Sequence, residues 1–298
     1  MKTLIVYVYF MSPSSDYNLS FFSKIELTYK PDIDYIIVIN GHRCSVNLPI
    51  IENVTVLKRD NIGFDFGGHA HALEHIQHQN KTYDYYFFMN SGVIGPIIPY
   101  YHKAHWSHIF IKKLNDKVKL VGTTIACLPA SDLGGYGPKV EGFFFLTDKI
   151  GLDLLQKEKT IFCNHDDKTL AIVNGEYGLS NCILRNGYSI DCMLKRYNNI
   201  DWNDKNNWNM NNNKHPSRKN SFFKNSINPY EVIFHKWFWH GSEYVNFDII
   251  KNYVNYVNNY HKINNNKKNY VNYVNNYHKI NNNKKNYVNN YHKINNNK

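Results

Sequence analysis

Two polar segments, each following an apolar and strand-like run, have the composition of a ligand-binding site. The first is residues 60–68, Asp-Asn-Ile-Gly-Phe-Asp-Phe-Gly-Gly, which follow the run at 54–57; the second is residues 90–92, Asn-Ser-Gly, which end the aromatic run at 83–89. A buried strand that stops at small polar residues places them at the carboxyl edge of its sheet, where open α/β sheets bind ligands. The two segments therefore predict one polar crevice.

Candidate nucleotide-binding residues lie in the first segment. Glycines such as Gly63 and Gly68 let a ligand approach the backbone closely, and a helix that begins behind them favours an anion. Asp60 and Asp65 can bond a ribose or a base, or they can cap the helix. An ordinary strand-to-helix turn has a similar composition, so both interpretations stay open.

Asn90 and Ser91 end a strand-like run, where side chains could hold a diphosphate directly or through a metal ion. Hard divalent cations prefer carboxylate oxygens, whereas Asn90 offers only an amide, so any Mn²⁺ or Mg²⁺ there would be held weakly. His235 is a second weak candidate for a metal ligand. The alternative for Asn90 and Ser91 is that they merely terminate the strand.

Two carboxylates are candidates for a general base. Glu176 lies between Gly175 and Gly178 after an apolar run, and Glu141 enters an apolar, strand-like run. A carboxylate facing the crevice could take a proton from a nucleophile. Glu176 could instead only cap a helix, and Glu141 competes with it for the catalytic role.

Lys236 is a candidate contact for a diphosphate because it lies among the aromatic residues Trp237 and Trp239 near the end of the globular part of the chain. The alternative is a tryptophan-rich closing strand packed on the core. The two interpretations are compatible.

The elements that must position these residues alternate between strands and helices. Helical patterns, including residues 69–79, separate the apolar runs, and this alternation indicates an α/β fold with a largely parallel sheet covered by helices on both faces. The predicted strands are residues 3–10, 34–40, 54–57, 85–89, 119–125 and 140–146.

The last part of the chain is a low-complexity repeat. A 17-residue unit, NYVNYVNNYHKINNNKK, occupies residues 252–268 and recurs unchanged at 269–285, and a shorter copy covers 286–298. Identity this complete indicates recent duplication, and the asparagine content predicts weak helix or disorder. We therefore expect a globular domain over residues 1–248 and a repeat tail over 249–298 without a catalytic role.

The formal charge of +11 resembles a nucleic-acid signal, but its distribution argues against one. Residues 251–298 contain nine lysines and no acidic residue, so the rest of the chain carries only about +2. We therefore do not expect nucleic acid to be the main partner. The basic tail could contact an acidic surface.

Cysteine usage and hydropathy favour a cytoplasmic protein. None of the five cysteines forms a CxxC pair, which is typical of reduced, structural thiols. Residues 1–11 read as a buried strand in preference to a signal peptide, and no apolar run is long enough to span a membrane.

Taken in order, five segments of residues 1–245 resemble GT-A glycosyltransferases of the rhamnan-synthesis type and polysaccharide-building glycosyltransferases of large DNA viruses. The family shows an Asn-x-Gly-x-Asp loop, a strand end of the Asn-Asp-Ser type followed by Gly-Pro, and a later Tyr-Glu-x-Gly-Leu-Ser segment. The corresponding segments here are DNIGFDFGG, YDYYFFMNSGVIGP, VEGFFFLTD, NGEYGLSNCILRNGYSI and NPYEVIFHKWFW.

The resemblance implies a GT-A, Rossmann-like fold and roles for individual residues. It places Asp60, Asn61, Gly63 and Asp65 near the nucleotide, and Asn90 and Ser91 at the metal and diphosphate motif. It makes Glu176 the candidate base and Lys236 a diphosphate contact. The segment Asn90-Ser91-Gly92 lacks the aspartate of the family's metal motif, which bears on metal dependence.

The function that the resemblance implies is transfer of a hexose or deoxyhexose from a nucleotide-diphosphate sugar to a glycan or glycoprotein acceptor, in the host cytoplasm if the protein is viral. The cofactor would be Mn²⁺ or Mg²⁺. A non-catalytic module of the same fold that binds a nucleotide sugar or a glycan is the alternative, because the segment Asn90-Ser91-Gly92 lacks the acidic metal ligand.

Overall fold

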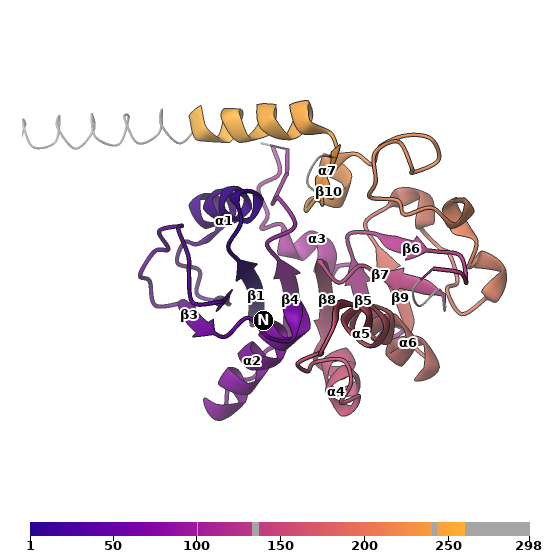
Figure 1. Ribbon diagram of the computed structural model, residues 1–298, viewed down its shortest axis with the longest axis horizontal. Coiled ribbons are helices and arrows are strands. Elements are labelled where there is room, and N and C mark those ends of the chain that lie inside the picture. The colour runs from indigo at the N-terminus through magenta and orange to yellow at the C-terminus, as the bar shows by residue number, and fades with distance from the viewer. Residues whose placement is uncertain (100, 133–136, 240–242, 260–298) are drawn as a thin grey trace, which may run out of the picture. The chain divides into compact units, whose positions relative to one another are not determined.

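The computed structural model describes residues 1–99, 101–132, 137–239 and 243–259 (Figure 1). The chain divides into two compact units, residues 1–247 and 248–298. This division lies one residue from the expected boundary, while the roles expected for the two parts remain predictions. Within the described ranges, no helix has the length and apolar character needed to cross a membrane.

The first unit is built on a seven-stranded sheet in the order β3-β2-β1-β4-β8-β5-β9. β8 is antiparallel to both of its neighbours, and the other adjacent pairs are parallel. The predicted α/β fold with a mostly parallel sheet is therefore confirmed. The strands are β1 (Thr3–Phe10), β2 (Ile33–Asn40), β3 (Val54–Arg59), β4 (Tyr85–Asn90), β5 (Val118–Gly122), β8 (Phe144–Asp148) and β9 (Ser189–Cys192).

Two short ribbons accompany this sheet. β6 (Ile125–Cys127) pairs with β7 (Pro138–Val140), and β10 (Phe238–Trp239) pairs with β11 (Glu243–Tyr244), both antiparallel. Each ribbon lies beside residues of the candidate site: β7 carries Lys139, and Lys236 precedes β10.

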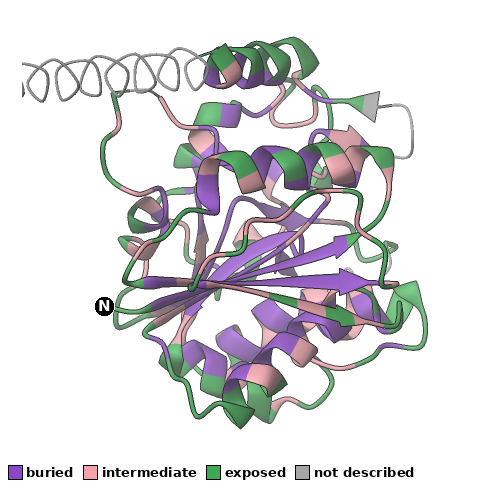
Figure 2. Ribbon diagram, turned by 90° about the vertical axis from the view of Figure 1, so that its left-hand side faces the viewer, coloured by how far each residue is buried: buried purple, intermediate pink, exposed green. Residues whose placement is uncertain are grey.

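Helices cover the sheet above and below its buried strands (Figure 2). Figure 1 shows α1 on one side of the strands and α2 and α4 on the other. The helices are α1 (Pro13–Glu26), α2 (Phe64–His78), α3 (Ser107–Ile111), α4 (Lys149–Lys157), α5 (Lys168–Leu170), α6 (Gly178–Arg185) and α7 (Pro229–Val232). A π-helical segment, η1 (Ala171–Tyr177), joins α5 to α6, and short 3₁₀ turns cover Lys195–Tyr197, Lys205–Asn207 and Met210–Asn213.

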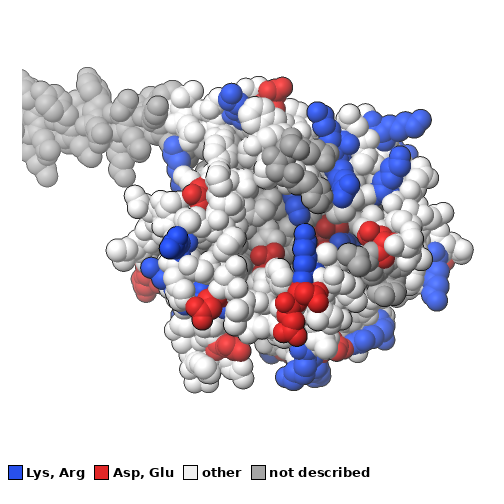
Figure 3. Space-filling view, viewed as in Figure 1, with Lys and Arg blue, Asp and Glu red and all other residues white. Residues whose placement is uncertain are grey.

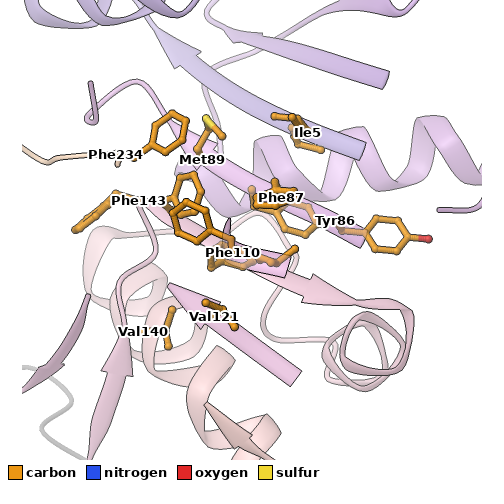
Figure 4. Packing of buried hydrophobic residues seen from close by; sticks show 14 of the residues in the cluster. Ile5, Tyr86, Phe87, Met89, Phe110, Val121, Val140, Phe143 and Phe234 are labelled. Atoms are coloured by element: carbon orange, nitrogen blue, oxygen red, sulfur yellow. The ribbon is translucent and has the colours of Figure 1, made fainter. Parts of the chain in front are cut away.

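An aromatic core anchors the segment that carries Lys236. The Phe234 ring lies 4.7 Å from both Trp106 and Phe144, and Phe144 lies 4.7 Å from Phe110. All four residues are buried, and Figure 4 shows Phe110 and Phe234 in this core. Because each buried large side chain contributes about 1.5–3 kcal/mol, the core fixes the position of the backbone that leads to Lys236.

Two predicted strands differ from the observed ones. The strand expected over residues 140–146 is divided between β7 and β8, and the backbone turns at Glu141, whose carbonyl accepts from Phe144 N at 3.3 Å. The strand expected over 119–125 ends at Gly122, and the chain then enters β6. In both places, a glycine packed closely against a neighbour lies where the strand breaks.

The described part of the second unit, residues 248–259, is helical. The expectation of weak helix or disorder in the repeat stays a prediction. The remaining repeat copies, from residue 260 onward, lie outside the described residues.

Candidate active site

The loop after β3 brings an acidic side chain to the carboxyl edge of the sheet. Gly63 precedes α2 with φ of +70°, a conformation that side-chain-bearing residues rarely adopt. A Cβ at this position would lie 2.4 Å from Asn164 Cα, so glycine is required there for two reasons. The tight turn places Asp65 in the first turn of α2.

Asp65 and Asn90 meet at this edge. Asn90 Nδ2 donates to Asp65 Oδ2 at 2.6 Å, and Asn90 Oδ1 accepts from the backbone N–H of Gly92 at 2.8 Å. Burial raises the pKa of Asp65, and the hydrogen bond from Asn90 and the charge of Lys236 only partly oppose this effect. Both polar segments singled out in the sequence therefore contribute to one site.

Glu176 lies in η1 and is held by a buried lysine. Lys139 Nζ is 2.6 Å from Glu176 Oε2, and the Glu176 side chain is 25 % exposed. A Cβ at Gly142 would lie 2.8 Å from Glu176 Cγ, so the glycine lets this carboxylate approach the turn between β7 and β8. Glu176 is thus fixed by a charged partner yet remains open to a ligand.

Glu141 is the buried counterpart of Glu176. Its side chain is 3 % exposed, and its Oε1 lies 3.0 Å from His215 Nε2 and 3.8 Å from Lys139 Nζ. Burial raises the pKa of Glu141, but His215 and Lys139 outweigh that effect and lower it overall. Lys139 therefore connects the two carboxylates that competed for the role of general base.

Lys236 completes the group. Its Nζ lies 4.5 Å from the Trp239 ring centre and 5.3 Å from that of Phe143, and it forms no ion pair with any residue that the structure describes. Burial lowers the pKa of Lys236, against the attraction of Glu176, Glu141 and Asp65. Figure 3 shows acidic and basic side chains close together near the middle of the face in view.

We call these residues the charge cluster. They come from α2, β4, β7 and the turn after it, η1, the loop before α7 and the segment before β10. The members are Asp65, Asn90, Lys139, Glu141, Glu176, His215 and Lys236.

Three other residues predicted for the nucleotide site do not belong to the charge cluster. Asp60 is largely exposed and pairs with His42, whose Nε2 lies 2.8 Å from Asp60 Oδ1, and Asn61 is also exposed. A Cβ at Gly68 would lie 2.7 Å from a Val8 methyl group, so this glycine allows α2 to pack closely on β1.

Two further candidates are buried. Ser91 donates its hydroxyl to Ser15 Oγ at 3.0 Å. His235 is fully buried, with its Nε2 3.1 Å from Asn246 Nδ2, and burial lowers its pKa to about 4.

The donor set at Asp65 and Asn90 does not fit Mn²⁺ or Mg²⁺ well. One oxygen of each side chain already accepts a hydrogen bond, and hard cations require several oxygen ligands. Throughout the described ranges, no three His, Cys, Asp or Glu side chains are grouped as a metal site requires.

Sequence reasoning missed Lys139 and His215. Lys139 lies two residues before Glu141, and the period of a strand would have placed both side chains on one face. His215 comes from an asparagine- and lysine-rich segment in which no periodicity indicated a site.

Comparison with known proteins yields a weak likeness in structure and none in sequence. No family model matches the chain, and no curated protein matches it. A solved structure, the mannosyltransferase PcManGT from Pyrobaculum calidifontis in complex with GDP-Man and Mn²⁺, is similar with a TM-score of 0.38 and 13 % sequence identity. The match covers 64 % of this chain and 53 % of that chain, so this chain spans about half of its length. A likeness this low does not support a function.

Proposed function

We propose that the protein is a glycosyltransferase that moves a sugar from a nucleotide-diphosphate donor to a glycan or glycoprotein acceptor. The observation that carries the proposal is that the charge cluster contains both a partly exposed carboxylate and a lysine without an ion pair among the described residues. Glu176 is a held but partly exposed carboxylate, and Lys236 is a lysine without an ion-pair partner among the described residues. Sugar transfer with inversion uses a base for the acceptor hydroxyl and positive charge for the departing diphosphate.

The nucleotide would lie along the carboxyl ends of β1, β2 and β3, where α/β sheets bind ligands. Phe10, at the end of β1, is 51 % exposed and offers a ring face to a base. Arg59, at the end of β3, donates to Asn40 Oδ1 at 3.3 Å and to Asn164 Oδ1 at 2.6 Å, so its guanidinium is held at this edge. Asp60 and Asn61 follow directly and can reach a ribose.

The chemical step is a displacement at the anomeric carbon. The acceptor oxygen forms a bond to that carbon as its proton passes to the Glu176 carboxylate, and the bond to the diphosphate oxygen breaks with its electron pair. Lys236 stabilises the negative charge that develops on the diphosphate. Lys139 positions Glu176, and Glu141 with His215 holds Lys139 in turn.

The second candidate function is a non-catalytic module that binds a nucleotide sugar or a glycan. The observation that favours it is the strand end Asn90-Ser91-Gly92, which offers an amide and a hydroxyl and lacks the carboxylate that the resemblance implies there. Binding without transfer would distinguish this function from catalysis.

The proposal is tested by replacing the base. Glu176→Gln keeps the shape of the side chain and removes its proton affinity, so transfer should fall about 10²- to 10⁴-fold, equivalent to about 3 to 5 kcal/mol. Donor binding should change little, because the diphosphate is held by Lys236. Thermal shift with UDP-, GDP- and dTDP-linked hexoses, with and without Mn²⁺, identifies the donor, since a ligand at a hundred times its dissociation constant stabilises the fold by about 2.7 kcal/mol.

Three outcomes have different meanings. Normal transfer by Glu176→Gln together with inactive Glu141→Gln would place the base at Glu141. Full activity of both variants would favour a retaining mechanism without an enzymic base. Donor binding by the wild type without any transfer would favour the non-catalytic module.

A further inference from the structure

A second site lies apart from the charge cluster. It is a pocket of about 580 Å³, a volume in the range of about 300 to 1,000 Å³ typical of small-molecule sites. Its walls come from the loop after β4, α3, the residues after β9 and the region of α7. No member of the charge cluster lines it.

The pocket combines an apolar floor with aromatic side chains at its rim. Ile109, Met193 and Ile233 contribute to the floor, and Met193 and Ile233 are buried. Tyr101 and Tyr230 also line the pocket, and they are 70 % and 40 % exposed. Tyrosine offers a rigid apolar face together with a hydroxyl, a combination that suits a ligand with both C–H faces and hydroxyl groups.

The polar groups of the pocket carry little net charge, because Lys195, an exposed lysine that also lines it, is matched by the opposite charge of Glu231. Lys113 Nζ is 2.9 Å from Asp191 Oδ2 and 3.3 Å from Asn198 Oδ1, so its charge is already compensated. Glu231 Oε1 accepts from the backbone N–H of Lys195 at 2.7 Å, which leaves its other oxygen as an acceptor. A phosphate ligand would require uncompensated cations, whereas donors and acceptors side by side fit a neutral, polyhydroxylated ligand.

His102 adds an unused hydrogen-bonding group. It lines the pocket, and its Nε2 is buried without a hydrogen-bond partner among the residues that the structure describes. Buried polar atoms in proteins are usually paired, and this nitrogen is shielded from the open pocket, so a ligand would bond it only after the His102 ring or a neighbouring side chain rotates.

We propose that this pocket binds a neutral oligosaccharide. If the proposed function holds, that oligosaccharide is part of the acceptor. Ile233, which lines the pocket, accepts from Ile97 N at 2.7 Å, and Lys236 follows three residues later in the chain. An acceptor held here would have its distal sugars in the pocket. Another sugar of the same oligosaccharide would carry the reacting hydroxyl to Glu176.

The test measures binding of maltotetraose, cellotetraose, mannotetraose and chitotetraose to the full chain, by calorimetry and saturation-transfer NMR without donor. At least one should bind, and the double variant Tyr101→Ala/Tyr230→Ala should weaken it about tenfold or more, equivalent to about 1.4 kcal/mol. Tyr29→Ala is the matched control, because Tyr29 is also an exposed tyrosine, 60 % accessible, and does not line the pocket.

Each other outcome overturns the inference. These outcomes are no binding of any tetrasaccharide at millimolar concentration, equal binding by the double variant, and stronger binding of inorganic phosphate than of the neutral probes at the same pocket. Donor thermal shifts are measured separately. Donor binding without oligosaccharide binding would refute only the proposal that the pocket binds an oligosaccharide. Oligosaccharide binding without donor binding or transfer would refute only the proposed function.

Discussion

Replacing Glu141 with glutamine should destabilise the fold more than it changes turnover. The folded protein lowers the pKa of Glu141 from 4.5 to about 2, because the attraction of His215 and Lys139 outweighs burial. At 1.36 kcal/mol per pKa unit, this displacement corresponds to about 3 kcal/mol of stability near neutral pH. Breaking a buried ion pair costs a similar amount, about 3–5 kcal/mol, since the remaining partner is left uncompensated.

The pH dependence follows from the sign of the shift. A carboxyl group whose folded pKa is lowered stabilises the protein above its unfolded pKa of about 4.5, and the contribution is lost as the pH falls towards the folded value. The difference between the wild type and Glu141→Gln should therefore be about 3 kcal/mol at pH 7 and about 1 kcal/mol near pH 3. Urea unfolding followed by tryptophan fluorescence measures both values.

A matched control makes the same substitution at an exposed glutamate. Glu74 is exposed and lies 3.9 Å from His71, so Glu74→Gln should leave the free energy of unfolding nearly unchanged. A difference between Glu141→Gln and the wild type that is no larger than that of the control, or that stays constant between pH 3 and 7, would refute the reasoning.

Three further predictions concern the donor, the metal and the tail. Lys236→Met should weaken donor binding about 10- to 100-fold, as expected for one lost charged contact. The control Lys149→Met changes an exposed lysine paired with Asp153 and should not weaken it. Calorimetry with the identified donor measures both variants. Asn90→Asp should strengthen Mn²⁺ binding by adding a carboxylate, and an unchanged titration would count against a metal position here. Deleting residues 260–298 should leave the melting temperature and donor binding intact, because the segment contains no acid and mostly asparagine, tyrosine and lysine; a large drop in melting temperature would contradict this.

The part of the site that the sequence predicted depends on one rule of sheet geometry. Asp65 lies in the helix after β3, Asn90 ends β4, and parallel strands end at the same edge, so the strand pattern predicts that both residues lie at that edge. Because β2 and β1 lie between β3 and β4, their direct contact depends also on the strand order and on the course of α2. The apolar runs also predicted the fold class, because fully buried strands are nearly continuous in hydrophobicity.

The remaining contacts depend on long-range packing that no local pattern encodes. His215 reaches Glu141 across 74 positions of the chain, from a segment without periodicity. Gly68 permits close packing on Val8, and the predicted approach of a ligand requires the same absence of a side chain, so the sequence does not separate the two roles. The backbone turn at Glu141 was hidden because the apolar residues on either side read as one strand.

The π-helical form of η1 has a consequence for how the site could have arisen. A π-turn accommodates about one residue more than an α-turn, and one residue corresponds to a rotation of about 100° around a helix. Gaining or losing a single codon at Tyr177, between Glu176 and α6, would therefore turn Glu176 relative to α6 by about that angle. The carboxylate of Glu176 would then face away from Lys139 with no amino acid of the charge cluster substituted, so the arrangement of this cluster in a related chain can depend on the length of the segment as much as on its residues.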